Sequence, residues 1–195
     1  MSASAANVWF WRQMATWSTL LKRDAMALEY RRRIADARPD DPRALASLAH
    51  GLAQSGGRPE AIALLERAVA LDPANAGAWY NLGYLQQESQ RHDDALASFD
   101  RAIAIDPKLD LAHYGRALSL IKTERLEEAI EPLKRNTELQ PLSPYGFYQL
   151  AHVYHRLGRT EAAAKVIRRL SGFEPQVARQ LERETGIVPD PAPGP

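Results

Sequence analysis

Proline recurs in this chain at a fixed interval of 34 residues. The members of this series are Pro39, Pro73, Pro107, Pro141 and Pro175. Proline cannot donate a backbone hydrogen bond and disfavours the helical conformation in the residue before it, so each one is expected to end a helix. A constant period of this length predicts a repeat architecture, in which each unit packs on its neighbours along an axis.

The stretch from Ala76 to Pro107 shows what one repeat contains. Two apolar patterns with helical spacing lie on either side of a polar break at residues 89–91. The first pattern includes Trp79 and Gly83, and the second includes Phe99. Small residues such as Gly83 lie where two helix backbones would approach closely. We therefore predict a helical hairpin, which must bury its apolar faces against neighbouring hairpins.

Large and small residues keep their places in the other copies. The positions that correspond to Trp79, Gly83 and Phe99 are Leu45, Ala49 and Leu65 in the preceding copy, and Phe147, Ala151 and Ile167 in the last. Together with the terminal proline, this pattern resembles the tetratricopeptide repeat (TPR) family. The resemblance implies an all-α fold, a right-handed superhelical solenoid of stacked antiparallel helical hairpins (a TPR array) that ends in a C-terminal capping helix.

The repeat predicts how the chain is organised. Residues 1–7 are expected to be frayed, and the proline-rich residues 187–195 to form an extended tail. Between them we expect a degenerate first TPR-like hairpin at 8–39, TPR repeats at 42–73, 76–107, 110–141 and 144–175, and a capping helix at 176–186. That last helix combines one narrow apolar stripe with a polar remainder, as the end of a repeat array requires.

Composition argues against several classes of function. The chain has 25 basic and 24 acidic residues, and this balance creates no overall field that would attract nucleic acid. It contains no cysteine, no glycine-rich phosphate loop and no HExxH motif. His152 and His155 share a helix face, but no carboxylate stands beside them in ligand spacing. We therefore predict no enzymatic activity, cofactor, metal or small-molecule substrate.

The N-terminal segment contains an apolar run that Arg12 and Gln13 interrupt. A signal peptide needs a continuous apolar core behind a positive segment, and a membrane-spanning helix needs about 20 apolar residues. We therefore predict neither, and a cytoplasmic location is the default expectation.

The resemblance also implies a binding surface, because in TPR proteins the first helices of successive hairpins line the concave side. The corresponding positions here combine tyrosine rings with amide, imidazole and charged groups, which suit a peptide. The residues implied are Arg43, His50, Gln54, Tyr80, Asn81, Tyr84, Tyr114, Lys122, Tyr145, Tyr148, His152, His155 and Arg156. We interpret the chain as a non-catalytic scaffold or adaptor that binds a peptide or helix of another protein in this groove.

Aromatic residues near the N-terminus leave a second function open. Trp9, Phe10, Trp11 and Trp17 lie in an amphipathic helical pattern. They can pack on the next repeat, and the 34-residue register favours this for Trp11. Alternatively, they form a docking face for self-assembly, for a larger complex or for a membrane, where the arginines at 31–33 would assist. The mixed charges of this region argue against membrane contact.

The fourth repeat departs from the pattern. Arg116 stands at a large apolar position, Asn136 at a close-contact position, and Pro132 inside the second helix. An interior proline removes a helical hydrogen bond and predicts a kink. One hypothesis is that the kink opens a pocket in which Arg116 and Asn136 bind a partner's carboxylate. The other is that Arg116 pairs within the chain, with Glu131 or Glu138.

Overall fold

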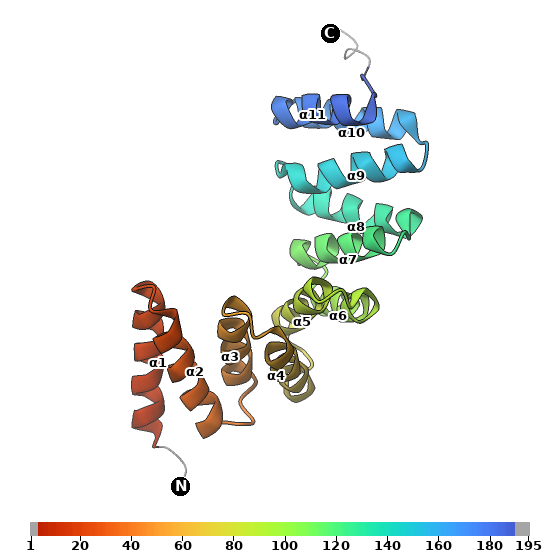
Figure 1. The fold of residues 1–195 in the computed structure, drawn as a ribbon. Coiled ribbons are helices and arrows are strands. Elements are labelled where there is room, and N and C mark those ends of the chain that lie inside the picture. The colour runs from red at the N-terminus through yellow and green to blue at the C-terminus, as the bar shows by residue number, and fades with distance from the viewer. Residues whose placement is uncertain (1–3, 190–195) are drawn as a thin grey trace. The chain divides into compact units, whose positions relative to one another are not determined.

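A computed structural model describes residues 4–189 (Figure 1). Within that range the chain forms helices and no strand, so the predicted all-α class is confirmed. The helices are α1 (Ala5–Leu20), α2 (Asp24–Ala37), α3 (Pro42–Gln54), α4 (Arg58–Leu71), α5 (Ala76–Glu88), α6 (His92–Ile105), α7 (Asp110–Lys122), α8 (Leu126–Leu139), α9 (Pro144–Arg156), α10 (Thr160–Ser171) and α11 (Pro175–Thr185). None of the helices in this range is long and apolar enough to cross a membrane.

Successive helices pair as hairpins, and one turn residue of each hairpin has a positive φ angle. These residues recur every 34 positions: Lys22 (55°), Gly56 (88°), Gln90 (61°), Glu124 (60°) and Gly158 (70°). Glycine adopts this left-handed conformation without strain, whereas the other three side chains must be held there by the packing of the two helices. The degenerate first hairpin therefore turns in the same way as the regular ones.

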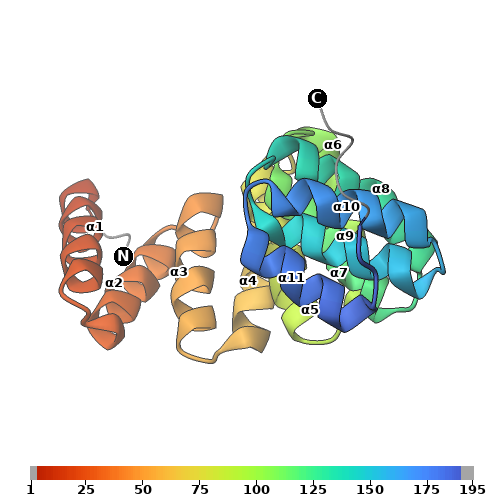
Figure 2. The same ribbon diagram turned by 90° about the horizontal axis from the view of Figure 1, so that it is seen from above.

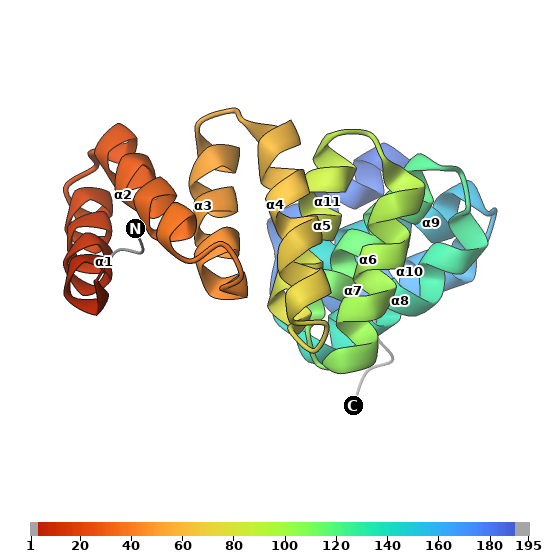
Figure 3. The same cartoon turned by 90° about the horizontal axis from the view of Figure 1, so that it is seen from below.

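Contacts between helices divide the chain into two compact units, one that runs to Ile105 and one that begins at Asp106. In the first unit, α2 packs on α3 and α4 packs on α5, while α5 and α6 lie side by side (Figure 3). In the second unit, α8 packs on α9, and α11 covers both α9 and α10 (Figure 2). The predicted stacking of hairpins is thus present within each unit.

One aromatic ring is fully buried where α5 and α6 of the first unit meet. Phe99 on α6 is 0% exposed, and a Cβ atom at Gly83 of α5 would lie 2.9 Å from its ring. Glycine is therefore what allows α5 and α6 to approach this closely. Trp79 is only half-buried: its indole N–H donates to the Pro73 carbonyl oxygen at 3.1 Å, and the Arg101 guanidinium lies 5.7 Å from its ring centroid.

Helix α8 of the second unit continues through Pro132 to Leu139. Asn136, near its end, is 5% exposed, and its amide N–H donates to the Asp110 carbonyl oxygen at 3.1 Å. Its amide oxygen lies against Gly146 of α9, where the second, third and fourth repeats carry alanine. Gly146 on α9 has no side chain, and this leaves room for the Asn136 side chain on α8.

These contacts contradict the pocket hypothesis for the fourth repeat. Asn136 is buried and already bonded, so it cannot reach a partner's carboxylate. Arg116 acts within the chain, where its charge reaches Glu128. The pKa of the Glu128 carboxyl lies below its ordinary value, first because Arg125 donates hydrogen bonds to it at 2.6 and 2.7 Å, and further because of the Arg116 charge.

The ordered structure extends further at both chain ends than the sequence predicted. Helix α1 begins at Ala5 rather than residue 8, because the Ser4 hydroxyl accepts a hydrogen bond from the Asn7 backbone N–H at 3.3 Å and caps the helix. At the other end Ile187 is buried and its N–H donates to the Thr185 hydroxyl at 3.2 Å, so the chain is still packed there. The remainder of the predicted frayed end (residues 1–3) and tail (190–195) lies outside the described residues.

The aromatic residues of α1 lie on both of its sides. Trp11 is partly buried against a small cluster that includes Val8 of the same helix, and this agrees with internal packing. Trp9, Phe10 and Trp17 are exposed, so for these three the interpretation as core residues is wrong. Helix α1 thus carries large apolar residues on more than one side, and only one side can face α2.

Candidate functional site

A cavity of about 280 Å³ lies between α3, α4 and α5 in the first unit. Four of the residues predicted to bind a partner line it: His50 and Gln54 from α3, and Asn81 and Tyr84 from α5. Residues three or four positions apart share one face of a helix, which is why each pair reaches the same space. The apolar part of the lining consists of Ala46, Ala53, Leu65 and Leu85.

The polar side chains around this cavity differ in how they are bonded. The side-chain nitrogens of Gln54 and His50 lie 3.1 Å apart, and an Arg58 guanidinium nitrogen lies 3.6 Å from a Glu88 carboxylate oxygen. Asn81 is exposed, and its side chain makes no hydrogen bond within residues 4–189. Its amide is therefore available both to donate and to accept.

Tyr84 supplies the aromatic surface of the cavity and is itself supported from behind. Its ring stacks on that of Tyr80, with centroids 6.4 Å apart and planes inclined by 28°. The Tyr80 ring in turn lies 6.1 Å from that of the buried Phe99. Tyr80 was predicted to contact a partner, but it is half-buried and does not line the cavity; its contacts hold Tyr84 in place.

Arg43 lies apart from that cavity. It lines a wider one of about 810 Å³ between α1, α2, α3 and the end of α4, together with Arg12, Arg31 and Asp41. Within it, an Arg12 nitrogen lies 3.4 Å from an Asp41 carboxylate oxygen, and Arg31 donates to the Thr19 hydroxyl at 3.1 Å. Arg12 is thus partly neutralised by Asp41, and Arg31 is bonded to Thr19.

The second unit holds the remaining predicted residues, which differ in exposure and bonding. Tyr114 is half-buried, and burial raises the pKa of its hydroxyl, opposed by a hydrogen bond with Gln149. Lys122, Tyr145 and His155 are exposed. Arg156, also exposed, forms an ion pair with Glu124 of the turn before α8.

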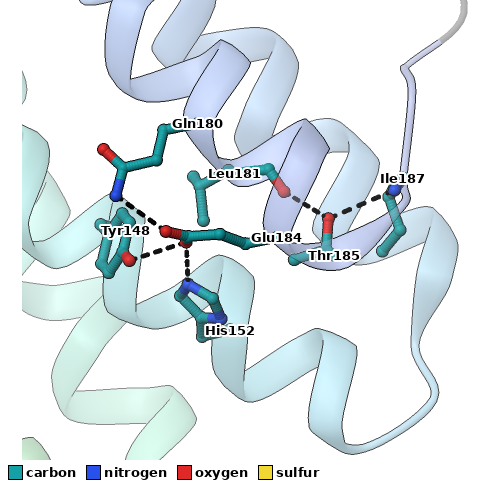
Figure 4. Close-up of polar contacts among 7 residues, drawn as sticks. All are labelled: Tyr148, His152, Gln180, Leu181, Glu184, Thr185 and Ile187. Carbon is teal, nitrogen blue, oxygen red and sulfur yellow. Dashed lines mark hydrogen bonds and ion pairs between the residues drawn. The ribbon is translucent and has the colours of Figure 1, made fainter.

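Two predicted residues of α9 are engaged by the capping helix α11 (Figure 4). The Tyr148 hydroxyl donates to a Glu184 carboxylate oxygen at 2.7 Å, and His152 Nε2 lies 3.0 Å from the same oxygen. The other carboxylate oxygen accepts from the Gln180 amide at 2.8 Å. The bond to Glu184, and then burial, raise the pKa of Tyr148. A partner that used Tyr148 or His152 would have to displace Glu184.

Acid is expected to weaken this attachment of α11. The pKa of the Glu184 carboxyl lies below its ordinary range, chiefly because Gln180 and then Tyr148 donate hydrogen bonds to it. A carboxyl whose pKa is lower in the folded state contributes stability above its unfolded-state pKa, and this contribution is lost as the pH falls through the folded-state pKa. We expect wild type to have a higher midpoint of thermal unfolding than Glu184→Gln at neutral pH, with the difference shrinking below about pH 4.

Circular dichroism melts of both proteins over a pH series would measure that difference. A gap between wild type and Glu184→Gln that stays constant from neutral to acid pH would show that the ionised carboxylate contributes nothing here.

Sequence reasoning missed residues that reach these sites from other helices. Arg58 and Leu65 line the first cavity from α4, whereas the family resemblance points only to first helices. Gln180 and Glu184 come from a helix predicted as a cap, and no local pattern marks them as partners of Tyr148. Among residues 4–189, no cluster of three or more histidine, cysteine, aspartate or glutamate side chains is placed to hold a metal ion.

Comparisons with known proteins agree on the fold. The structure of a MamA protein matches with a TM-score of 0.81 and 18% identity, covering 96% of this chain and 100% of that one. MamA from Desulfovibrio magneticus RS-1 matches with a TM-score of 0.79 and 21% identity, covering 93% and 98%. YrrB, described as a TPR protein with an unusual peptide-binding site, matches with a TM-score of 0.77 and 17% identity, covering 93% of each chain. No curated protein sequence matches.

The sequence itself matches a family as well. A model of the tetratricopeptide repeat covers residues 46–110 and again 114–176, which together make up more than half of the chain. These two segments cover most of the second, third, fourth and fifth predicted repeats. This chain therefore belongs to the tetratricopeptide repeat family.

Proposed function

We propose that this chain is a non-catalytic interaction scaffold that binds a peptide segment of another protein, with its principal contact in the cavity between α3 and α5. The observation that carries the proposal is the convergence of His50, Gln54, Asn81 and Tyr84, from two different helices, on one cavity with an apolar lining. Such a combination of aromatic surface, apolar depth and unbonded amide is typical of peptide recognition.

The dimensions of the cavity favour a side chain over a whole small molecule. Its volume of about 280 Å³ falls just below the range of about 300–1,000 Å³ that is usual for small-molecule sites. An apolar side chain of the peptide would lie against Leu65 and Leu85, with its flank on the Tyr84 ring. Asn81 would bond to the peptide backbone, because its amide can both donate and accept.

Support by Tyr80 makes Tyr84 a suitable anchor. A ring that is already held in place loses little side-chain entropy when a partner binds, so more of the contact free energy appears as affinity. The likeness to YrrB, described as a TPR protein with an unusual peptide-binding site, supports the proposal. Tyr114, Lys122, Tyr145, His155 and Arg156 are proposed as additional contacts for a longer partner.

Replacing Tyr84 with alanine is expected to weaken peptide binding about tenfold or more, equivalent to about 1.4 kcal/mol. A peptide selected from a displayed library against the full chain serves as the probe, and its Kd is measured by calorimetry. Asn81→Ala should weaken binding in the same direction. Leu142→Ala, which truncates an exposed apolar side chain of the second unit outside the proposed contacts, is the control and should leave Kd unchanged.

Two results would count against the proposal. One is that the wild-type chain retains no peptide from the library. The other is that the selected peptide binds Tyr84→Ala and Asn81→Ala as tightly as wild type, or loses affinity only with Leu142→Ala. Because Tyr84 and Asn81 are exposed, unchanged circular dichroism melts would show that a loss of binding is not a loss of folding.

A further inference from the structure

Helix α1 presents an apolar face that no other described helix of the first unit covers. Successive residues of a helix are rotated by about 100°, so five large side chains of α1 lie within an arc of about 120°. They are Trp9 (64% exposed), Phe10 (51%), Trp17 (56%), Leu20 (69%) and Leu21 (60%). Within α1, Gln13 is the one polar residue in that arc. We call these five residues the outer face of α1.

The position of α1 in the first unit explains why this face is open. Val8, Ala15 and Ser18 form its buried side, and α2 is the helix on which it packs. Within the described part of the first unit, the five exposed side chains lie on the opposite side of α1 from these buried residues. Single exposed apolar residues are ordinary, but a contiguous group of this size on one helix indicates a surface that binds something.

The charges around the outer face indicate what it binds. From residue 4 to residue 23 the chain has no aspartate or glutamate. Lys22 and Arg23 follow Leu21 directly, are exposed, and form no ion pair within the described residues. A second copy of the chain would bring like charges together here with no acid on the face to pair with them. A surface of negative charge would pair with them.

The side-chain types fit the boundary between lipid headgroups and hydrocarbon. Tryptophan and phenylalanine are favoured at this depth, and leucine beside them adds apolar area. Thr16 borders the face, and its hydroxyl donates to the carbonyl oxygen of Arg12 at 3.0 Å. This hydroxyl is therefore already bonded inside the helix.

We propose that the outer face of α1 binds the surface of an anionic lipid bilayer, with the helix lying parallel to the membrane plane. The apolar side chains would enter the headgroup boundary to about 5–10 Å, and Lys22 and Arg23 would contact lipid phosphates. This inference does not depend on the peptide cavity, which lies on α3, α4 and α5.

Co-sedimentation of the full chain with vesicles tests the proposal. Wild type is expected to bind vesicles of phosphatidylcholine and phosphatidylglycerol more tightly than vesicles of phosphatidylcholine alone. Binding should weaken near 1 M salt, where the screening length falls to about 3 Å. The double variant Trp17→Gln/Leu20→Gln should lose about tenfold or more in affinity for the mixed vesicles, because it removes apolar area from the centre of the face.

A second double variant tests the contribution of the basic side chains to vesicle binding, and a single variant serves as the control. Lys22→Gln/Arg23→Gln should abolish the preference for anionic vesicles while weak binding remains. Leu142→Gln is the matched control: Leu142 is 74% exposed but lies in the second unit, so its loss should leave vesicle binding unchanged. All variants replace exposed residues, and equal circular dichroism melts would verify that they fold.

Three outcomes would overturn the inference. Wild type fails to sediment with the anionic vesicles, or Trp17→Gln/Leu20→Gln sediments as wild type does. The third is that, without lipid, wild type associates with itself as its concentration rises and the double variant does not. That result would assign the outer face of α1 to a second copy of the chain.

Discussion

Replacing Phe99 with alanine is expected to lower the free energy of unfolding by about 3–5 kcal/mol. The ring is fully buried between α5 and α6, and its removal leaves a cavity that the surrounding helices can fill only in part. The ring also supports Tyr80 and, through it, Tyr84, so the same variant should weaken peptide binding. Among the described residues of the first unit, Phe99 has the largest fully buried side chain.

Tryptophan fluorescence during urea unfolding is the appropriate measurement, because all four tryptophans lie in the first unit. Trp79→Ala is the comparison. Trp79 stands at the family's tryptophan position, but it is only partly buried, so its loss should cost less than the loss of Phe99. A smaller effect for Phe99→Ala than for Trp79→Ala would contradict this assignment of the core.

Substituting alanine for Gly146 is expected to lower the free energy of unfolding of the second unit by about 1–3 kcal/mol. In an exposed helix, this change would stabilise by about 1 kcal/mol. Here the new methyl group would clash with the amide oxygen of the buried Asn136 and lie 3.1 Å from the Thr137 methyl carbon. Overpacking therefore outweighs helix propensity.

A double-mutant cycle tests whether contact with Asn136 causes the loss of stability in Gly146→Ala. Asn136→Ala removes the group that Gly146→Ala would strike, so the double variant should recover most of the loss and show a favourable coupling energy. It would restore the alanine pair that the second and third repeats carry at Ala68 and Ala78, both of which belong to one core cluster. Urea unfolding followed by far-UV circular dichroism gives the energies.

Gly77→Ala is the matched control for the effect of helix propensity. A Cβ atom at Gly77 would meet only the Asn75 side-chain oxygen, at 3.5 Å, which is an ordinary contact. We expect this variant to be neutral or slightly stabilising. If Gly146→Ala behaves like Gly77→Ala, or if Asn136→Ala does not rescue it, the proposed complementarity of α8 and α9 is wrong.

Much of the candidate cavity was predictable, because family positions on first helices map directly onto helix faces. His50, Gln54, Asn81 and Tyr84 meet there because their spacing places each pair on one face and because α3 and α5 belong to consecutive hairpins. Tyr148 followed the same rule but meets Glu184, which lies 36 residues away on α11. Periodicity marks which face a residue occupies, but not which later helix covers that face.

The sequence by itself determined the helices, their order and the 34-residue register, since these depend on local spacing, on proline and on the size of residues at close contacts. Only the tertiary structure decided which of two apolar sides of α1 is buried, and which large residue, Phe99 or Trp79, is enclosed. It also decided that Asn136 fits because Gly146 leaves room. Burial and fit depend on neighbouring helices, and no single helical pattern contains that information.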